Sequence, residues 1–182
     1  MKKTILLLVT TFTMYLNVSA QEVTVEEPEF AEETLLLLSD TQGETLARED
    51  GFFQFSRGWS KVKTMLVLSG IRSKSYTAKG KTTTRLVIKA KDNLTDPHSF
   101  INIFKFEVKN DERRYQLSEA GLGGKYKTNN LSSINYSAKR YGESSYLITL
   151  NGLTPGEYGI VIGDPNTANT KNAWKVTTFA VE

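Results

Sequence analysis

Residues 101–109 read INIFKFEVK, and this stretch decides the fold class. Its second part alternates apolar residues with charged ones, namely Phe104, Phe106 and Val108 with Lys105, Glu107 and Lys109. A period of two is typical of a β-strand with one buried face and one wet face. Ile101 and Ile103 stand on the opposite phase. This change predicts either a bulge near Ile103 or burial of both faces at that end of the strand.

The same alternation recurs along most of the chain. We expect further strands at residues 61–68, 85–90, 146–150, 158–162 and 174–181, with shorter ones at 52–55 and 134–137. Residues typical of turns separate these segments, and no long pattern of helical period interrupts them. The sequence therefore predicts an all-β protein, an antiparallel β-sandwich of immunoglobulin-like or fibronectin-like general architecture.

One local motif supports that architecture. Residues 153–158 read LTPGEY, where Pro155 and Gly156 make a turn and Tyr158 opens the next strand. The motif resembles the L-x-P-G-x-Y corner of many immunoglobulin-like sandwiches, in which the tyrosine hydroxyl bonds to nearby backbone. Together with residues 100–107 and 139–147, it also makes residues 60–163 similar to uncharacterised exported β-proteins of Gram-negative bacteria. That resemblance implies a fold and no activity.

The first twenty residues have the pattern of a signal peptide. Lys2 and Lys3 precede an apolar run at 4–16, and Val18-Ser19-Ala20 supplies the small residues needed for cleavage before Gln21. The apolar run is shorter than the ~20 residues that span a bilayer. A lipoprotein would need a cysteine at the cleavage point, and the chain has none. We expect export to the periplasm, the cell surface or the exterior, with no lipid anchor and no membrane span after cleavage.

Beyond the signal peptide, two regions are predicted. Residues 21–33 look like an acidic, partly disordered lead-in. Residues 34–182 suit one β-sandwich domain. The absence of cysteine excludes disulfides, thiolate metal sites and cysteine nucleophiles, so the core must hold by packing alone.

Charge is unevenly distributed along the chain. Of the 23 basic residues, 21 remain after the signal lysines are removed, against 20 acidic ones. Residues 21–50 carry ten acidic residues and one basic residue, Arg48. Residues 51–91 carry ten basic residues and no acidic one, and the remainder balances at ten each. The near-neutral mature chain is therefore polarised along its length.

This polarity nominates a candidate binding surface. If the basic strands lie side by side, their outward side chains form a positive face for an anionic glycan or for lipopolysaccharide phosphates, with nucleic acid the least expected ligand. The candidate residues are Trp59, Lys61, Lys63, Arg85, Lys89 and Lys91. The alternative is that the acidic segment 22–50 pairs with these strands as ordinary ion pairs.

Catalytic chemistry finds little support in the composition. The single histidine, His98, lies in Asp96-Pro97-His98-Ser99, too close to its neighbours for a triad. One histidine without cysteine does not supply a zinc site. Oxygen ligands at Asp92, Asn93 and Asp96, or at Asp164 and Asn166, leave calcium open, but neither set has the spaced loop of a known calcium motif, so turn formation is the preferred explanation. We predict no catalytic residue, metal or cofactor.

Three hypotheses for the function follow. The first is a non-catalytic binding or scaffolding module of the bacterial cell envelope, with a protein or an anionic glycan as partner. The second is a glycan-active enzyme with paired carboxylates, which the sequence cannot nominate. The third is a domain for secretion sorting or surface attachment, formed by the last thirty or so residues.

Overall fold

The computed structural model describes residues 22–77, 82–121, 126–128, 133–163 and 174–182. The predicted signal peptide, residues 1–20, lies outside them. In the described residues no helix is long and apolar enough to cross a membrane. The only helical element among them is a 3₁₀ turn, η1 (Pro97–Ser99). The strands are β1 (Thr34–Leu37), β2 (Gly43–Thr45), β3 (Arg48–Arg57), β4 (Lys61–Ser69), β5 (Tyr76–Thr77), β6 (Thr83–Lys89), β7 (Ile101–Lys105), β8 (Glu107–Lys109), β9 (Glu112–Gly121), β10 (Tyr126–Thr128), β11 (Ser137–Tyr141), β12 (Ser145–Asn151), β13 (Gly156–Ile162) and β14 (Trp174–Val181).

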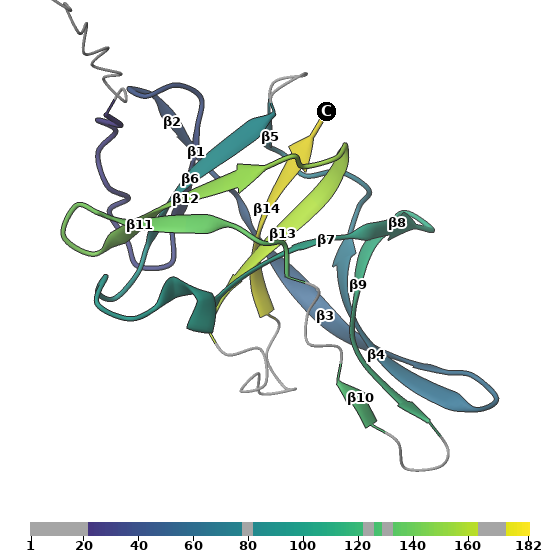
Figure 1. Cartoon of the computed structure of the whole chain (residues 1–182). Coiled ribbons are helices and arrows are strands. Elements are labelled where there is room, and N and C mark those ends of the chain that lie inside the picture. Colours follow the sequence, from purple (N-terminus) through teal and green to yellow (C-terminus); the bar gives the residue numbers. More distant parts are fainter. Residues whose placement is uncertain (1–21, 78–81, 122–125, 129–132, 164–173) are drawn as a thin grey trace, which may run out of the picture.

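The strands form two sheets that pack against each other (Figure 1). The five-stranded sheet has the order β11-β12-β6-β1-β2, and the nine-stranded sheet has the order β10-β9-β4-β3-β14-β13-β7. Two short strands join off this path: β8 pairs antiparallel with β9, and β5 pairs parallel with β14. The predicted all-β class and antiparallel sandwich are confirmed.

A first core fills the space between the two sheets. Its buried side chains come from β1, β6 and β12 on one side and from β7, β13 and β14 on the other. Leu86, Ile88 and Ile148 are wholly buried on the five-stranded side, opposite Ile103 and Phe179. Each comes from a strand whose alternate residues are apolar, which is why the period of two identified most of these strands.

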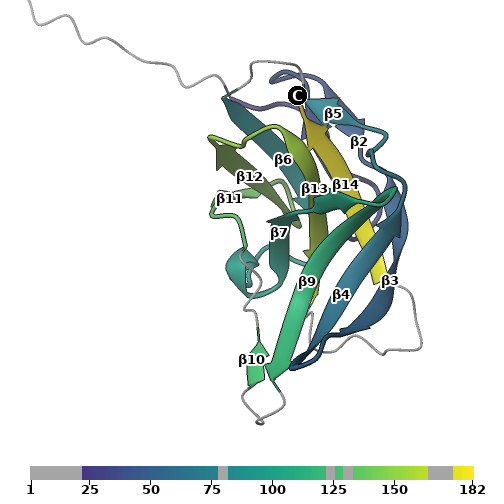
Figure 2. The ribbon, with the colours of Figure 1, turned by 90° about the vertical axis from the view of Figure 1, so that its right-hand side faces the viewer.

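A second core lies on the other face of β7, β13 and β14. The nine-stranded sheet curls because β3 changes partner along its length, from β14 at Arg48–Gly51 to β4 at Phe52–Arg57. The curl brings Leu66, Leu68 and Tyr115 against Phe104 and Val161. Figure 2 shows β7, β13 and β14 between β6 and β12 on one side and β4 and β9 on the other. The central strands are thus covered on both faces.

This arrangement explains the change of phase in the opening stretch. Ile101 and Ile103 point into the first core, whereas Phe104 and Phe106 point into the second. β7 continues without a break through Ile101–Lys105 and pairs in regular register with β13. Of the two sequence interpretations, burial of both faces is correct, and no bulge is needed.

The second core also requires a glycine in β13. A Cβ atom at Gly159 would lie 2.7 Å from Cε2 of Phe104 and 2.8 Å from Cε2 of Phe106. Both rings are buried and pack edge to face on each other, with centroids 5.1 Å apart. The two rings therefore cannot move aside for a larger residue at position 159.

The turn before β13 contains the hydrogen bond from tyrosine to backbone that the L-x-P-G-x-Y motif predicts. The hydroxyl of Tyr158 donates to the carbonyl of Thr154 at 2.6 Å. Gly156 has φ +149°, and the Lys105 side chain occupies the space where its Cβ would stand. Lys105 also donates to the carbonyl of Pro155 at 2.7 Å. The turn therefore depends on glycine both for its backbone angle and for this contact.

A buried arginine closes the curl of the sheet. The side chain of Arg113 on β9 is 1% exposed, and it forms a two-pronged ion pair with Glu49 on β3 at 3.0 and 2.6 Å. Its remaining donors reach the carbonyls of Gly70 and Ser69 at 3.0 and 3.1 Å. Burial alone would raise the pKa of Glu49, but the hydrogen bonds from Arg113 and Thr178 outweigh it and lower that pKa. The ionised pair is therefore the stable form.

Some elements differ from the sequence prediction. Residues 134–136, expected as part of a strand, lie beside β7, where the Ile134 amide donates to the Ile103 carbonyl at 2.7 Å, and β11 starts only at Ser137. The ten-residue strand β9 was not predicted, because its buried positions include Arg113 and so disguise the alternation.

Replacing Gly159 by alanine should lower the free energy of unfolding by about 1–3 kcal/mol, since the added methyl group overpacks the second core. Urea denaturation measures this difference. Gly58→Ala is the control, because its Cβ would stand 3.6 Å from the nearest atom, an ordinary contact. An equal loss in both variants would show that the second core is not packed as described.

Arg113→Met should lower the free energy of unfolding by about 3–5 kcal/mol, because Glu49 is left without its cation. The neighbouring Arg114→Met is the matched control. Arg114 pairs with Glu112 at 2.7 Å at the surface, where such a pair contributes about 0–1 kcal/mol.

The same pair should give a pH signature. Because the pKa of Glu49 is lower in the folded protein, its stabilising contribution is present above the ordinary value of 4.5 and is lost as the pH falls through the folded pKa. Denaturation curves between about pH 3 and 7 should show this slope in the wild type and a weaker one in Glu49→Gln. Identical slopes would contradict the assignment.

Candidate functional site

The six predicted binding residues do not form one face. Trp59 lies in the turn between β3 and β4, with Lys61 and Lys63 on β4 in the nine-stranded sheet. Arg85 and Lys89 lie on β6 in the five-stranded sheet, and Lys91 follows it, exposed. The idea that the two basic strands lie side by side is therefore wrong, because β4 and β6 belong to different sheets.

The outer face of β6 is covered. Arg85, Val87 and Lys89 alternate with the core residues Leu86 and Ile88, so they point away from the first core. Val87 is nevertheless wholly buried. Something must therefore lie over this face of the five-stranded sheet.

The acidic lead-in provides that cover. The Thr24 amide donates to the Asp40 carbonyl at 2.8 Å, and the hydroxyl of Tyr141 on β11 donates to the Val25 carbonyl. Glu27 binds Lys89 at 2.5 Å, and Asp40 pairs with Arg85. On β6, the alternative of ordinary ion pairing with segment 22–50 is correct, and its basic residues are not free for a ligand.

Glu27 is the main polar anchor of the lead-in. Besides Lys89, it accepts a hydrogen bond from the Ser144 amide at 3.3 Å, and it packs on Gly142. Burial would raise its pKa, but the bonds from Lys89 and Ser144 lower it overall. The carboxylate is therefore held in its charged form against the sheet.

Glu27→Gln should lower the free energy of unfolding at pH 7 by about 1 kcal/mol, because the variant loses a charge-assisted pair. The difference from wild type should shrink below the ordinary pKa of 4.5, as wild-type Glu27 takes up a proton. Urea denaturation at pH 7 and pH 3.5 measures it. Glu26→Gln, a neighbour with an exposed side chain, is the control. A similar effect at Glu26 would mean that the loss reflects net charge alone.

The lysines of β4 find a different partner. Lys61 and Lys63 both lie near Glu119 on β9, at 2.5 and 3.6 Å, and their side chains remain 57% and 43% exposed. The hydrogen bond from Lys61 lowers the pKa of Glu119. One carboxylate thus faces two cations, and the acidic segment 22–50 contributes nothing here.

A groove of about 560 Å³ lies on the outer face of β3, β4, β8 and β9. Register explains its floor: Met65 pairs with Gln54 and with Gln116, so the three side chains share one face, opposite to Leu66 and Tyr115 in the second core. A register shift between Thr64 and Met65 bends the ladder at this point. We call this hollow the basic groove. Its lining residues are Gln54, Phe55, Ser56, Arg57, Lys63, Met65, Lys105, Glu107, Lys109, Arg114, Tyr115 and Gln116. By register, the side chains of Phe55, Arg57 and Tyr115 belong to the opposite face of their strands.

The charge of the groove is strongly one-sided. Among the described residues, its lining includes five cationic residues, Arg57, Lys63, Lys105, Lys109 and Arg114, and one acidic residue, Glu107. The ammonium of Lys105 is engaged outside the lining, since it donates to Thr154 and Pro155 at 2.7 Å. Two carboxylates just outside it reduce the excess: Glu119 lies near Lys63, and Glu112 binds Arg114. In the described residues, no ion pair compensates Arg57 or Lys109. The groove keeps a net positive charge of two after these carboxylates are counted.

Sequence reasoning found only one residue of this groove. Lys63 was predicted, whereas the cations contributed by β3, β7, β8 and β9 were not. The sequence of residues 101–109 did contain a hint, because Lys105 and Lys109 alternate with apolar residues and share the exposed positions with Glu107. What was missing was the pairing of β8 with β9 and of β9 with β4, which gathers these cations around Lys63.

Groups considered for catalysis or metal binding have structural roles. The exposed His98 ring stacks on Tyr136, with centroids 4.3 Å apart. Asp96 caps η1 by accepting from the His98 amide at 3.0 Å. Asp92 accepts from the Leu94 amide at 2.9 Å, and Asn93 donates to backbone carbonyls.

In the described part of the chain, no group of three acidic, histidine or cysteine side chains could hold a metal. The other calcium candidates, Asp164 and Asn166, lie outside it.

The comparisons with known proteins add no relative: no family model, no curated protein and no solved structure matches the chain. The resemblance to exported β-proteins of Gram-negative bacteria stays a prediction.

Proposed function

We propose that this protein is an exported, non-catalytic binding module of the bacterial cell envelope that takes an anionic glycan in the basic groove. The observation that carries the proposal is the excess of five cations over one carboxylate in the groove lining. Carboxylate or sulfate groups along a sugar chain suit such a row of lysine and arginine side chains.

Neutral hydrogen-bonding side chains at the groove support a sugar ligand. Polar amides from Gln54 and Gln116 lie between the cations and offer hydrogen bonds to hydroxyl groups. Anionic, hydroxyl-rich ligands therefore suit this lining better than apolar ones.

The hypothesis of a glycan-active enzyme is less well supported. Hydrolysis by paired carboxylates requires two acids that face each other across the bound sugar. Among the described residues, Glu107 is the only acidic one in the lining of the basic groove, and the nearby Glu119 and Glu112 are engaged with cations. The sorting hypothesis gains nothing either, because β14 lies in the middle of the nine-stranded sheet.

Charge reversal in the groove tests the proposal. We expect the mature protein to bind dextran sulfate and not neutral dextran, with an affinity that falls as salt is raised. Lys109→Glu should weaken binding about tenfold, or ~1.4 kcal/mol, since a cation is replaced by an anion. Isothermal titration calorimetry at two salt concentrations measures both effects.

The control is Lys139→Glu, an exposed lysine on β11 in the other sheet. It makes the same change in net charge away from the groove and should leave binding nearly unchanged. Equal losses in the two variants would show that binding follows net charge and not this groove. Binding that ignores salt would also overturn the proposal.

A further inference from the structure

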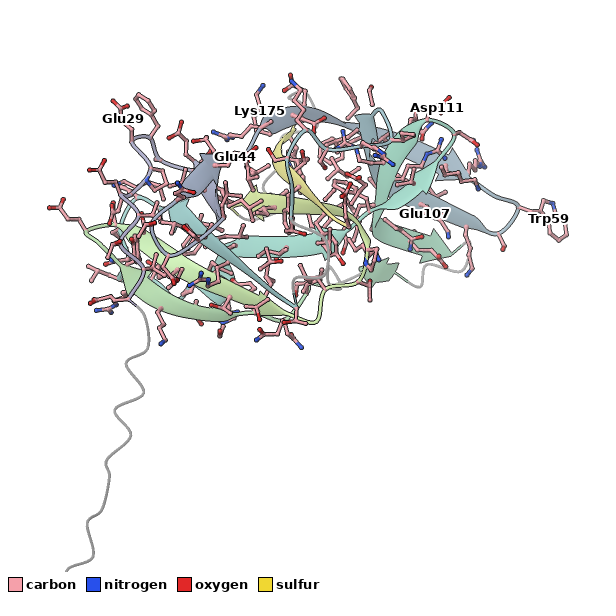
Figure 3. The ribbon with its side chains drawn as sticks, turned by 90° about the horizontal axis from the view of Figure 1, so that it is seen from above. Glu29, Glu44, Trp59, Glu107, Asp111 and Lys175 are labelled. Carbon is pink, nitrogen blue, oxygen red and sulfur yellow. The ribbon has the colours of Figure 1, made fainter. Side chains whose placement is uncertain are left out.

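The hairpin of β3 and β4 projects beyond the rest of the sandwich and ends in a single tryptophan (Figure 3). Trp59 lies at the turn and is 100% exposed. The Gly58 amide donates to the Lys61 carbonyl at 2.8 Å and closes the turn, so the fold does not depend on the indole ring. The indole ring is therefore available for a contact outside the molecule, and the neighbouring exposed side chains decide what kind of contact it suits.

Further apolar side chains continue from the tip along one face of the hairpin. Phe55 is 66% exposed and Val62 is 39% exposed. The register pairs Phe55 with Thr64 and Arg57 with Val62, which places both apolar residues on the same face. That face continues the second core beyond the point where β7 and β13 cover it. The projecting end of the hairpin is therefore an apolar wedge.

Cations surround this wedge. Arg57 and Lys61 flank the turn directly, and Lys63 follows on β4. Glu119 is the one described carboxylate that pairs with them, so the tip keeps a net positive charge of two. Aromatic rings with lysine and arginine at their base are the side chains found at the headgroup level of membranes.

We propose that Trp59 and the tip of the β3–β4 hairpin dock on an anionic lipid surface, with the indole among the headgroups and Arg57 and Lys61 on lipid phosphates. The charge of the tip is complementary to such a surface. Its shape favours lipid over a protein partner, because a narrow convex tip cannot supply the ~800 Å² per side of a stable protein interface. The tip shares Phe55, Arg57 and Lys63 with the lining of the basic groove, but Trp59 and Lys61 lie outside that lining, and the lipid proposal does not rest on the glycan ligand.

The tryptophan content of the chain makes a direct experiment possible. The chain has two tryptophans, and Trp174 packs edge to face on Phe53, with centroids 5.1 Å apart. Trp174→Phe leaves Trp59 as the only indole. Its emission should move to shorter wavelength with vesicles of three parts phosphatidylcholine to one part phosphatidylglycerol, and brominated lipid should quench it. Pure phosphatidylcholine vesicles should have a much smaller effect.

Vesicle sedimentation then measures the contribution of the tip. In the otherwise wild-type chain, Trp59→Ala should lower the partition coefficient at least tenfold without changing the unfolding midpoint. Lys61→Glu should lower the partition coefficient several-fold, and added salt should lower it as well. Leu94→Ala is the control, since this apolar residue is 74% exposed in a loop far along the chain from the hairpin.

The two proposed sites fail in different ways. Trp59→Ala should keep its affinity for dextran sulfate, whereas Lys109→Glu should keep most of its affinity for vesicles. The lipid proposal is overturned if Trp59 emission stays at its value in water with anionic vesicles at low salt, or if Trp59→Ala and Leu94→Ala sediment alike. Failure to bind dextran sulfate would leave that result intact and would count against the groove alone.

Discussion

The structure depends on burying both faces of β7, β13 and β14. A single partner sheet cannot bury these three strands, because each of their two faces carries apolar side chains. The five-stranded sheet covers one face, and the curl of β3 brings β4 and β9 over the other. The curl is therefore a packing requirement. In the described part of the chain, no layer lies opposite the ends of β3 and β4, and these ends form the projecting hairpin (Figure 1).

The curl also explains a buried charge. Where β9 meets the start of β3, Arg113 is surrounded by acceptors that come from distant parts of the chain: Glu49, Ser69, Gly70 and Ser73. A buried ion pair adds little net stability compared with an apolar contact, yet it is costly to separate. Its bonds are satisfied in the observed register, in which Arg113 lies opposite Leu68 and Val108. A slip of β9 by one residue would turn Arg113 to the other face of the sheet and leave Glu49 without this partner.

Local patterns predicted the fold better than the site. Strands with clean alternation were found, and the corner at Tyr158 could be identified because its bond spans four residues. β9 was missed, since a buried Arg113 looks polar in a sequence. The basic face was assembled wrongly because two basic strands next to each other in sequence belong to different sheets. Which strands become neighbours is a long-range property, and the groove depends on it.

The charge polarity of the chain becomes a spatial polarity. The acidic lead-in lies on the outer face of the five-stranded sheet, and the basic groove lies on the outer face of the β4–β9 layer. Two inter-sheet spacings of about 10 Å each separate these faces, whereas exposed charges are screened beyond ~8 Å at physiological ionic strength. The acids therefore neutralise β6 and leave the far end positive. A chain whose net charge is only +3 can in this way present a local cationic surface, and it does so where the hairpin also projects.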